Sequence, residues 1–274
     1  MKKLYLNTGR MNTIFNDLKD SLNGTLTLEN NQYNLTVKSK NAKGVIRGIM
    51  LSQQISYMEF DIVFHKDTML SMESGINSPI WFTYCFEGNL RHSFGINGKI
   101  KKVKSDQTGI VRNTSAINSI FYFEGFKHIR FSILSCNTSN IENTDLFSGL
   151  DKVFRNQNGN YITVATQNFL IAKKIKEFKA VPQKGMVKNL LRKRILESIL
   201  EIELEQYSYG YLKDIKPIIA LANKQIEELK RVSNLSISAM FSGVNLVSRN
   251  YLSRMLKEKY HLTFSKSYNQ KLVS

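Results

Sequence analysis

The stretch Ile55–Phe64, I-S-Y-M-E-F-D-I-V-F, decides the fold class of this chain. It is rich in β-branched and aromatic residues, which favour strands. Between about residues 24 and 134, runs of the same kind recur at 80–86, 119–123 and 127–134. Turn sequences separate the runs: Glu29-Asn30-Asn31, Glu87-Gly88-Asn89, Asn97-Gly98-Lys99 and Glu124-Gly125. This spacing predicts an antiparallel sandwich or barrel, and Asn97-Gly98 is the strongest hairpin signal in it.

Segments with helical periodicity precede and follow this β region in the sequence. Ahead of it, residues 11–22 place an apolar face on a short helix, formed by Ile14, Phe15, Leu18 and Leu22. Behind it, the polar composition of residues 137–160 predicts a linker with at most one short helix near 146–154. Further helices are predicted at 168–178, 186–206 and 218–232. The chain is therefore expected to be α+β, with the β domain first and an all-α segment after it.

The longest periodic segment covers residues 186–206. Apolar residues recur along it every three or four positions: Val187, Leu191, Ile195, Ile199 and Ile202. Lys188, Arg192, Lys193 and Glu197 occupy the opposite side, as on a solvated face. Such a stripe predicts a homodimer, and packing of the same stripe on the β domain is the alternative.

Composition and charge narrow the classes of protein. A chain of 274 residues with 42% hydrophobic residues is expected to form two domains. Its net charge of +17, of which residues 171–274 carry +11, indicates a polyanionic partner, with nucleic acid ahead of an anionic membrane. Cys85 and Cys136 are too few for a disulfide scaffold. With neither a secretory leader nor a membrane-spanning run in the sequence, we expect a cytoplasmic protein and no membrane partner.

The segment 247–260, V-S-R-N-Y-L-S-R-M-L-K-E-K-Y, has the features of a recognition helix. Ser248 is a suitable N-cap, so the helix is expected to begin at Arg249. One face then collects amides, hydroxyls and cations without a carboxylate: Asn250, Ser253, Arg254 and Lys257. A short helix at 236–242 and a turn precede it, which is the helix-turn-helix arrangement that inserts its second helix into a DNA major groove. An ordinary solvated surface helix is the alternative.

The order of residues in this segment resembles the AraC family of bacterial transcription regulators. The matching positions are Ser248, Tyr251-Leu252, Arg254, Met255-Leu256, Lys257 and Thr263-Phe264. The resemblance implies a cupin-like β jelly-roll sensor domain at 1–140, a linker with dimerisation helices at 141–212, and an AraC-type helix-turn-helix at 213–274. Phe241 and His261 depart from the family pattern, and only the first of the family's two helix-turn-helix units is recognisable before Ser274.

The resemblance also implies which residues contact double-stranded DNA. Asn250, Ser253 and Arg254 are expected to face base edges. Arg249 and Lys257 are expected to contact phosphates. Ser248, at the start of the helix, is expected to cap it at the DNA-binding surface.

No catalytic chemistry is expected. The histidines of this chain, His65, His92, His128 and His261, lack the close spacing of a cupin metal site, so we expect no metal and no cofactor. Neither a nucleophile elbow nor a phosphate-binding loop is present. Among the aromatic residues of 81–86, strand alternation sends Trp81 and Phe82 to opposite faces, so Trp81, Phe82 and Tyr84 are candidates for an effector pocket, with a filled core as the alternative.

These features together predict a sequence-specific DNA-binding transcription regulator, not an enzyme, that responds to a small effector. The alternative is a truncated AraC-like protein that senses an effector and dimerises without independent DNA binding.

Overall fold

The computed structural model describes residues 1–208 apart from 8–9, 76, 139–144 and 156–158. The chain divides into two compact units, Met1–Tyr209 and Gly210–Ser274, and the first is described below. The predicted helix-turn-helix and its DNA-contacting residues lie outside the described residues: Ser248, Arg249, Asn250, Ser253, Arg254 and Lys257.

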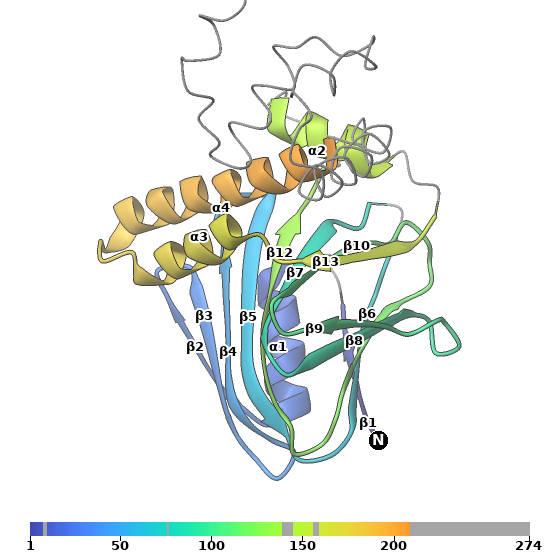
Figure 1. Cartoon of the computed structure of the whole chain (residues 1–274). Helices are drawn as coiled ribbons and strands as arrows, with labels where there is room; N and C mark the ends of the chain where they lie inside the picture. The colour runs from blue at the N-terminus through green and yellow to red at the C-terminus, as the bar shows by residue number, and fades with distance from the viewer. Residues whose placement is uncertain (8–9, 76, 139–144, 156–158, 209–274) are drawn as a thin grey trace, which may run out of the picture. The chain divides into compact units, whose positions relative to one another are not determined.

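The first unit is a mostly β sandwich of two sheets (Figure 1). One sheet has the order β1 (Lys2–Leu6), β6 (Thr68–Met72), β11 (Ser119–Phe123), β8 (Asn89–Phe94) and β9 (Lys101–Lys104). The other has the order β13 (Tyr161–Thr166), β10 (Gln107–Arg112), β7 (Ile80–Glu87), β12 (His128–Cys136), β5 (Ile55–Phe64), β4 (Ala42–Met50), β3 (Gln32–Lys38) and β2 (Thr25–Glu29). Neighbouring strands are antiparallel, as predicted, except for the parallel pair β1 and β6.

The predicted turns between the strands are present, with one difference in length. Asn30 and Asn31 have φ of 49° and 62° and join β2 to β3 in a tight hairpin, because asparagine tolerates the left-handed region that such a turn needs. Asn97 and Gly98 lie between the paired strands β8 and β9. There the loop spans residues 95–100, since Gly95 already turns the chain with a φ of 70°.

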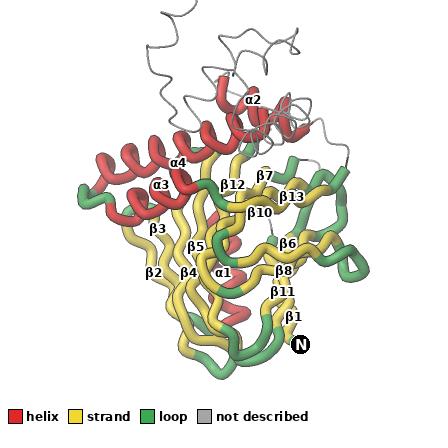
Figure 2. The backbone as a smooth tube through the Cα atoms, in the orientation of Figure 1, coloured by secondary structure: helices red, strands yellow, loops and turns green. Residues whose placement is uncertain are grey.

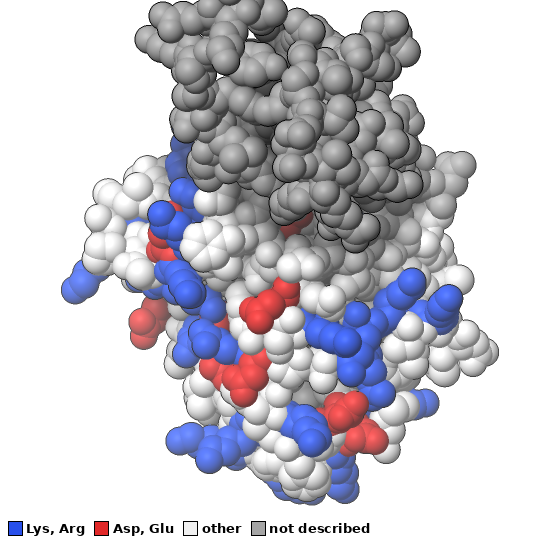
Figure 3. Space-filling view, viewed as in Figure 1, with Lys and Arg blue, Asp and Glu red and all other residues white. Residues whose placement is uncertain are grey.

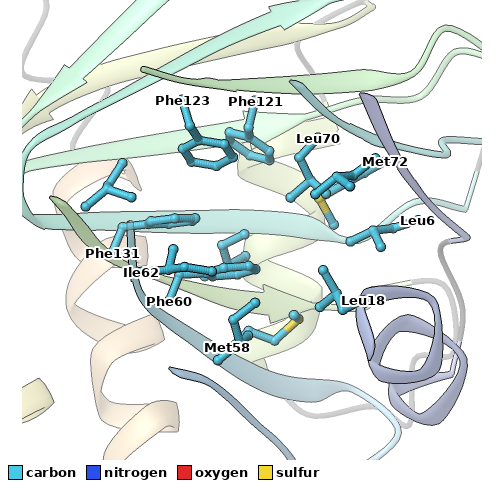
Figure 4. Packing of buried hydrophobic residues seen from close by; sticks show 14 of the residues in the cluster. Leu6, Leu18, Met58, Phe60, Ile62, Leu70, Met72, Phe121, Phe123 and Phe131 are labelled. Carbon is cyan, nitrogen blue, oxygen red and sulfur yellow. The ribbon is translucent and has the colours of Figure 1, made fainter. Parts of the chain in front are cut away.

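The core between the sheets is made of aromatic and long aliphatic side chains (Figure 4). The rings of Phe60 and Phe131 stack with centroids 4.5 Å apart, and Phe123 adds a second ring 5.7 Å from Phe131. Helix α1 (Met11–Leu22), predicted from its periodicity, buries its apolar face in the same core. Gly48 on β4 makes room for it, because a Cβ there would lie 2.3 Å from the Phe15 ring.

Three helices cover the outer face of the eight-stranded sheet (Figure 2). They are α2 (Asp145–Arg155), α3 (Phe169–Ala180) and α4 (Gly185–Ser208), and both ends of each helix lie within two residues of the predicted range. Their buried residues join Tyr57, Phe82, Tyr84 and Leu134 of the sheet in a second apolar cluster. The three helices therefore pack on the sheet within the first unit.

Helix α4 changes character along its length. Leu196, Ile199 and Leu200 are fully buried against the sheet. Toward its N-terminus, Met186, Val187, Leu190 and Leu191 are 79%, 55%, 57% and 40% exposed. The second half of α4 therefore packs on the β sandwich, which was one of the two alternatives for this helix. Its first two turns leave an apolar face exposed, as the other alternative, a homodimer interface, would require.

A buried polar pair fastens the second half of α4 to the sheet. Glu203 is 1% exposed, and the Tyr84 hydroxyl of β7 donates a hydrogen bond to its Oε1 at 3.1 Å. Burial raises the pKa of the Glu203 carboxyl to about 7, against the opposing effect of that hydrogen bond. A group of this kind makes the docking of α4 sensitive to pH.

We predict that Glu203→Gln stabilises the protein at pH 8 and changes it little at pH 4.5. The folded state holds the Glu203 proton more tightly than the unfolded chain, so this group's contribution is fully present below its ordinary pKa. It is lost as the pH rises to about 7. The gain at pH 8 should be on the order of 3 kcal/mol in denaturant unfolding. Glu201→Gln, an exposed change on the same helix, is the control, and an equal gain for Glu203→Gln at both pH values would contradict the prediction.

Candidate effector cavity

A cavity of about 460 Å³ opens at one end of the sandwich. Its walls come from both sheets and from α1: the ends of β4 and β6, the beginnings of β5 and β7, and the last part of β12. Loop residues 52–54, 75 and 77–79 contribute to its rim. A volume of this size lies within the range of small-molecule sites.

The interior of the cavity is apolar and adaptable. Four methionines line it, Met11, Met50, Met58 and Met72, together with Ile14, Ile55, Ile133 and Trp81. Methionine is unbranched and polarisable, so such a wall adjusts to ligands of different shape. Met58 and Met72 come from opposite sheets, and Figure 4 shows both pointing into the space between them.

The rim supplies hydrogen-bonding groups. Serines, asparagines and glutamines line it: Ser52, Gln53, Gln54, Ser56, Asn77, Ser78, Ser135 and Asn137. Part of this polarity holds the loops themselves, since Ser52 Oγ accepts from the Ile55 N–H at 3.1 Å and Ser78 Oγ from the Gly75 N–H at 2.7 Å. The cavity therefore has an apolar interior under a neutral polar edge.

None of the described residues that line this cavity carries a charge. Burying an ion where no partner compensates it is costly. The chemistry of the walls accordingly favours uncharged organic molecules over carboxylates, phosphates or ammonium compounds.

The predicted pocket residues separate across strand β7, as the alternation predicts. Trp81 points to the inner side and lines the cavity, with its ring 6.2 Å from that of Phe121. Phe82 and Tyr84 point to the outer side, where they are fully buried under the helices and are not among the residues that line the cavity. Of the three candidates, the structure brings only Trp81 to this site.

The methionines and the rim were not predicted from the sequence. They come from separate elements, and each is an ordinary core or loop residue by itself. The distinguishing feature is that four methionines gather at the open end of the sandwich. They are far apart in the sequence and come together only when the strands are paired, so the sequence alone gives no signal for them.

The histidines are dispersed within the described part of the chain. His92 is fully buried beside the rings of Phe94 and Phe121, at 4.7 and 5.0 Å. His128 contacts Asp61 at 2.8 Å and Glu87 at 2.9 Å on the surface. His65 lies beside Phe126, and His261 is outside the described residues. Across the described ranges, no group of three histidine, cysteine or acidic side chains is arranged to hold a metal ion.

Comparison with known proteins gives distant structural similarities. No protein-family model and no curated protein sequence matches the chain. Among solved structures, it is similar to the AraC-like transcriptional activator CuxR, with 11% identity and a TM-score of 0.44 over 80% of this chain and 81% of that one. It is also similar to a variant of apo ToxT from Vibrio cholerae strain SCE256, with 8% identity and a TM-score of 0.38 over 78% of each chain.

A third similarity is to an oxalate decarboxylase variant from Bacillus subtilis, with 12% identity and a TM-score of 0.30 over 43% of this chain. The match covers 32% of the decarboxylase, so this chain spans about a third of that enzyme's length. All these TM-scores are below 0.5. In the described part of the chain, no helix has the length and apolar character needed to cross a membrane.

Proposed function

We propose that this protein is a sequence-specific DNA-binding transcription regulator that responds to a small effector. The observation that carries the proposal is the ordered set Ser248, Tyr251-Leu252, Arg254, Met255-Leu256, Lys257 and Thr263-Phe264, which resembles the AraC-type reader. The strongly positive balance of residues 171–274 supports it, because cations neutralise DNA phosphates. In this organisation residues 1–140 form a cupin-like sensor and residues 213–274 form the reader.

The DNA-binding part of the proposal is tested by a pair of substitutions. Arg254→Ala should cost about 1–3 kcal/mol and relax specificity at one base position, because an arginine that contacts guanine with two hydrogen bonds reads sequence. Lys257→Ala should weaken binding to all duplexes about equally and lower the slope of log K against log salt by roughly one unit. Titrating the full chain with specific and scrambled duplexes at several salt concentrations measures both effects.

The two variants answer different questions. If both lower the affinity uniformly with the same change in salt slope, the helix is only a basic surface. The effector-sensing protein without independent DNA binding then becomes the better proposal.

The effector proposed for the cavity is a small uncharged organic molecule. Its apolar part would lie among the methionines, and a hydroxyl, carbonyl or amide would meet the rim. The absence of charge among the described lining residues supports this class. Trp81 is the chain's single tryptophan, so its fluorescence reports on occupancy of the cavity directly.

We predict that 1-octanol changes the Trp81 fluorescence saturably, whereas octanoate binds at least about tenfold more weakly because its carboxylate would be buried without a partner. Met58→Phe, which fills part of the cavity, should weaken octanol binding. Met69→Leu, a change at a buried methionine outside the cavity, is the matched control. Octanoate binding as tightly as octanol, or no saturable response to either, would exclude this effector class.

A homodimer is the third part of the proposal. The exposed apolar face at the start of α4, formed by Met186, Val187, Leu190 and Leu191, supports pairing with a second copy, because contiguous apolar patches of this kind mark interaction surfaces. Ile199, on the same predicted stripe, is fully buried in the unit's own core. A substitution there would test folding rather than association.

We predict that Val187→Glu combined with Leu190→Glu converts a dimer into a folded monomer, since two carboxylates would enter an apolar interface. Leu170→Glu, at an exposed leucine of α3, should leave the dimer intact. Sedimentation at micromolar concentration, with circular dichroism to verify folding, measures the result. A monomeric unaltered protein would contradict the proposed dimer.

A further inference from the structure

A second pocket lies on the outer face of the eight-stranded sheet, beside the α3–α4 helix pair. Its volume is about 260 Å³, and it is separate from the effector cavity, with which it shares no lining residue. Strands β3, β4, β5 and β12 form its floor, and the end of α3 and the first half of α4 form its wall.

The side chains of this pocket carry a large excess of positive charge. Four cations line it, Arg47, Arg130, Lys179 and Arg192, against the single carboxylate of Glu59. On the wider face shown in Figure 3, by contrast, basic and acidic side chains alternate over the helices and the sandwich. The pocket is thus a local concentration of cations rather than part of a uniformly basic surface.

Glu59 satisfies only two of the four cations. Its Oε1 accepts from Lys179 Nζ at 2.5 Å and from Arg130 Nε at 3.3 Å. Lys179 also lies over the Phe86 ring, 4.6 Å from its centroid. These contacts fasten the end of α3 to the sheet and explain why two of the cations are present.

Arg192 has no carboxylate partner among the described residues. It is 8% exposed, and its guanidinium donates to the Phe178 carbonyl at 3.4 Å and to Gln32 Oε1 at 3.0 Å. A guanidinium has five N–H donors, so donors remain for a further acceptor. Burial lowers the pKa of Arg192, and it lowers the pKa of Lys179 despite the neighbouring Glu59, as expected where positive charge is poorly compensated.

Tyr57 supplies an independent indication of a ligand. Its side chain lines the pocket and is 4% exposed, and its hydroxyl lies beside the buried Ser132 hydroxyl, with no other hydrogen-bonding group of the described residues in reach. When one of these two hydroxyls donates to the other, the second O–H donor of the pair still has no acceptor among the described residues. Leaving a buried hydroxyl unsatisfied is costly, whereas a bound acceptor would remove the cost. Burial and Glu59 raise the pKa of Tyr57, which keeps the phenol protonated as a donor.

We propose that this pocket binds a small organic anion, whose phosphate or carboxylate group is held by Arg192, Arg47 and the Tyr57 hydroxyl. The remainder of the ligand would lie against the Phe178 ring, which packs 4.6 Å from that of Tyr57. The volume suits a small metabolite, since it is below the usual range for drug-sized ligands. Such a ligand would join α3 and α4 to strands β4 and β5 through one anionic group.

The test uses the full chain with phenyl phosphate and benzoate as probes, and benzyl alcohol as the uncharged analogue. Calorimetric titrations are run at constant ionic strength set with potassium chloride. At least one of the two anions should bind at a single saturable site and raise the melting temperature, and benzyl alcohol should not. The anion that binds identifies the group, phosphate or carboxylate, for which the pocket is built.

Three variants separate a built site from general charge attraction. Arg47→Gln and Tyr57→Phe should each weaken the binding by at least about fivefold, because each removes a donor to the anionic group. Arg47 is exposed and makes no hydrogen bond to a described side chain, and Tyr57→Phe keeps the ring, so both proteins should fold. Lys43→Gln removes one exposed cation from the same strand, outside the pocket, and should change the affinity by less than about twofold.

The proposal is overturned if neither anion binds saturably up to about 10 mM, where a metabolite site should be occupied. It is also overturned if Arg47→Gln and Lys43→Gln have equal effects, or if Tyr57→Phe stabilises the protein and leaves binding unchanged. No DNA enters these measurements, so their outcome is independent of the regulator proposed above.

Discussion

The central strands of the eight-stranded sheet are apolar on both faces, and this constraint organises the rest of the unit. In β7, Trp81 faces the other sheet, whereas Phe82 and Tyr84 face outward. Both faces must be removed from water, because burial of one large aromatic side chain removes roughly 150–250 Å² of its surface from solvent. The second sheet and α1 cover one side, and α2, α3 and α4 cover the other. The helices are therefore required by the sheet.

This requirement explains the uneven character of α4. Where the helix crosses the apolar part of the sheet, Leu196, Ile199 and Leu200 are buried. Where it extends over the polar positions of β3 to β5, the residue facing the sheet is Arg192, which contacts Gln32. Its first turns pass beyond the apolar cluster, so Met186 and Leu190 remain exposed. One helix thus serves as a cover, as a wall of the cationic pocket and as an open apolar face.

The sequence predicts those features that depend on neighbours along the chain. Strand alternation, the helical periodicity of α1 and the asparagine turn at Asn30 are local, and the structure agrees with each. Strands β1 and β13 were not predicted. β1 is a five-residue strand whose pairing with β6 depends on distant residues, and β13 is an edge strand, half-buried along most of its length, that depends on β10. Propensity is a poor guide at such positions, because pairing and burial decide them.

The two pockets could not be predicted for the same reason. Arg47, Arg130, Lys179 and Arg192 come from separate elements, and nothing in their sequence positions links them until β4, β5 and β12 are paired. For the cavity between the sheets, alternation correctly gives Trp81 an inner position, but it cannot tell which inner residues lie at the open end. That distinction depends on where the sheets diverge and the loops close over them.

Strand β5 connects the two pockets, since its successive side chains point to opposite faces. Ser56 and Met58 line the neutral cavity between the sheets, and Tyr57 and Glu59 line the cationic pocket outside. The backbone between them is held on both sides, by β4 and by β12. An apolar ligand on the inner side and an anion on the outer side would therefore contact residues 56–59 of β5 from opposite faces. The difference in charge between the two linings would keep each proposed ligand class out of the other's site, because an anion would be unpaired in the inner cavity and a neutral molecule would leave Arg192 uncompensated in the outer pocket.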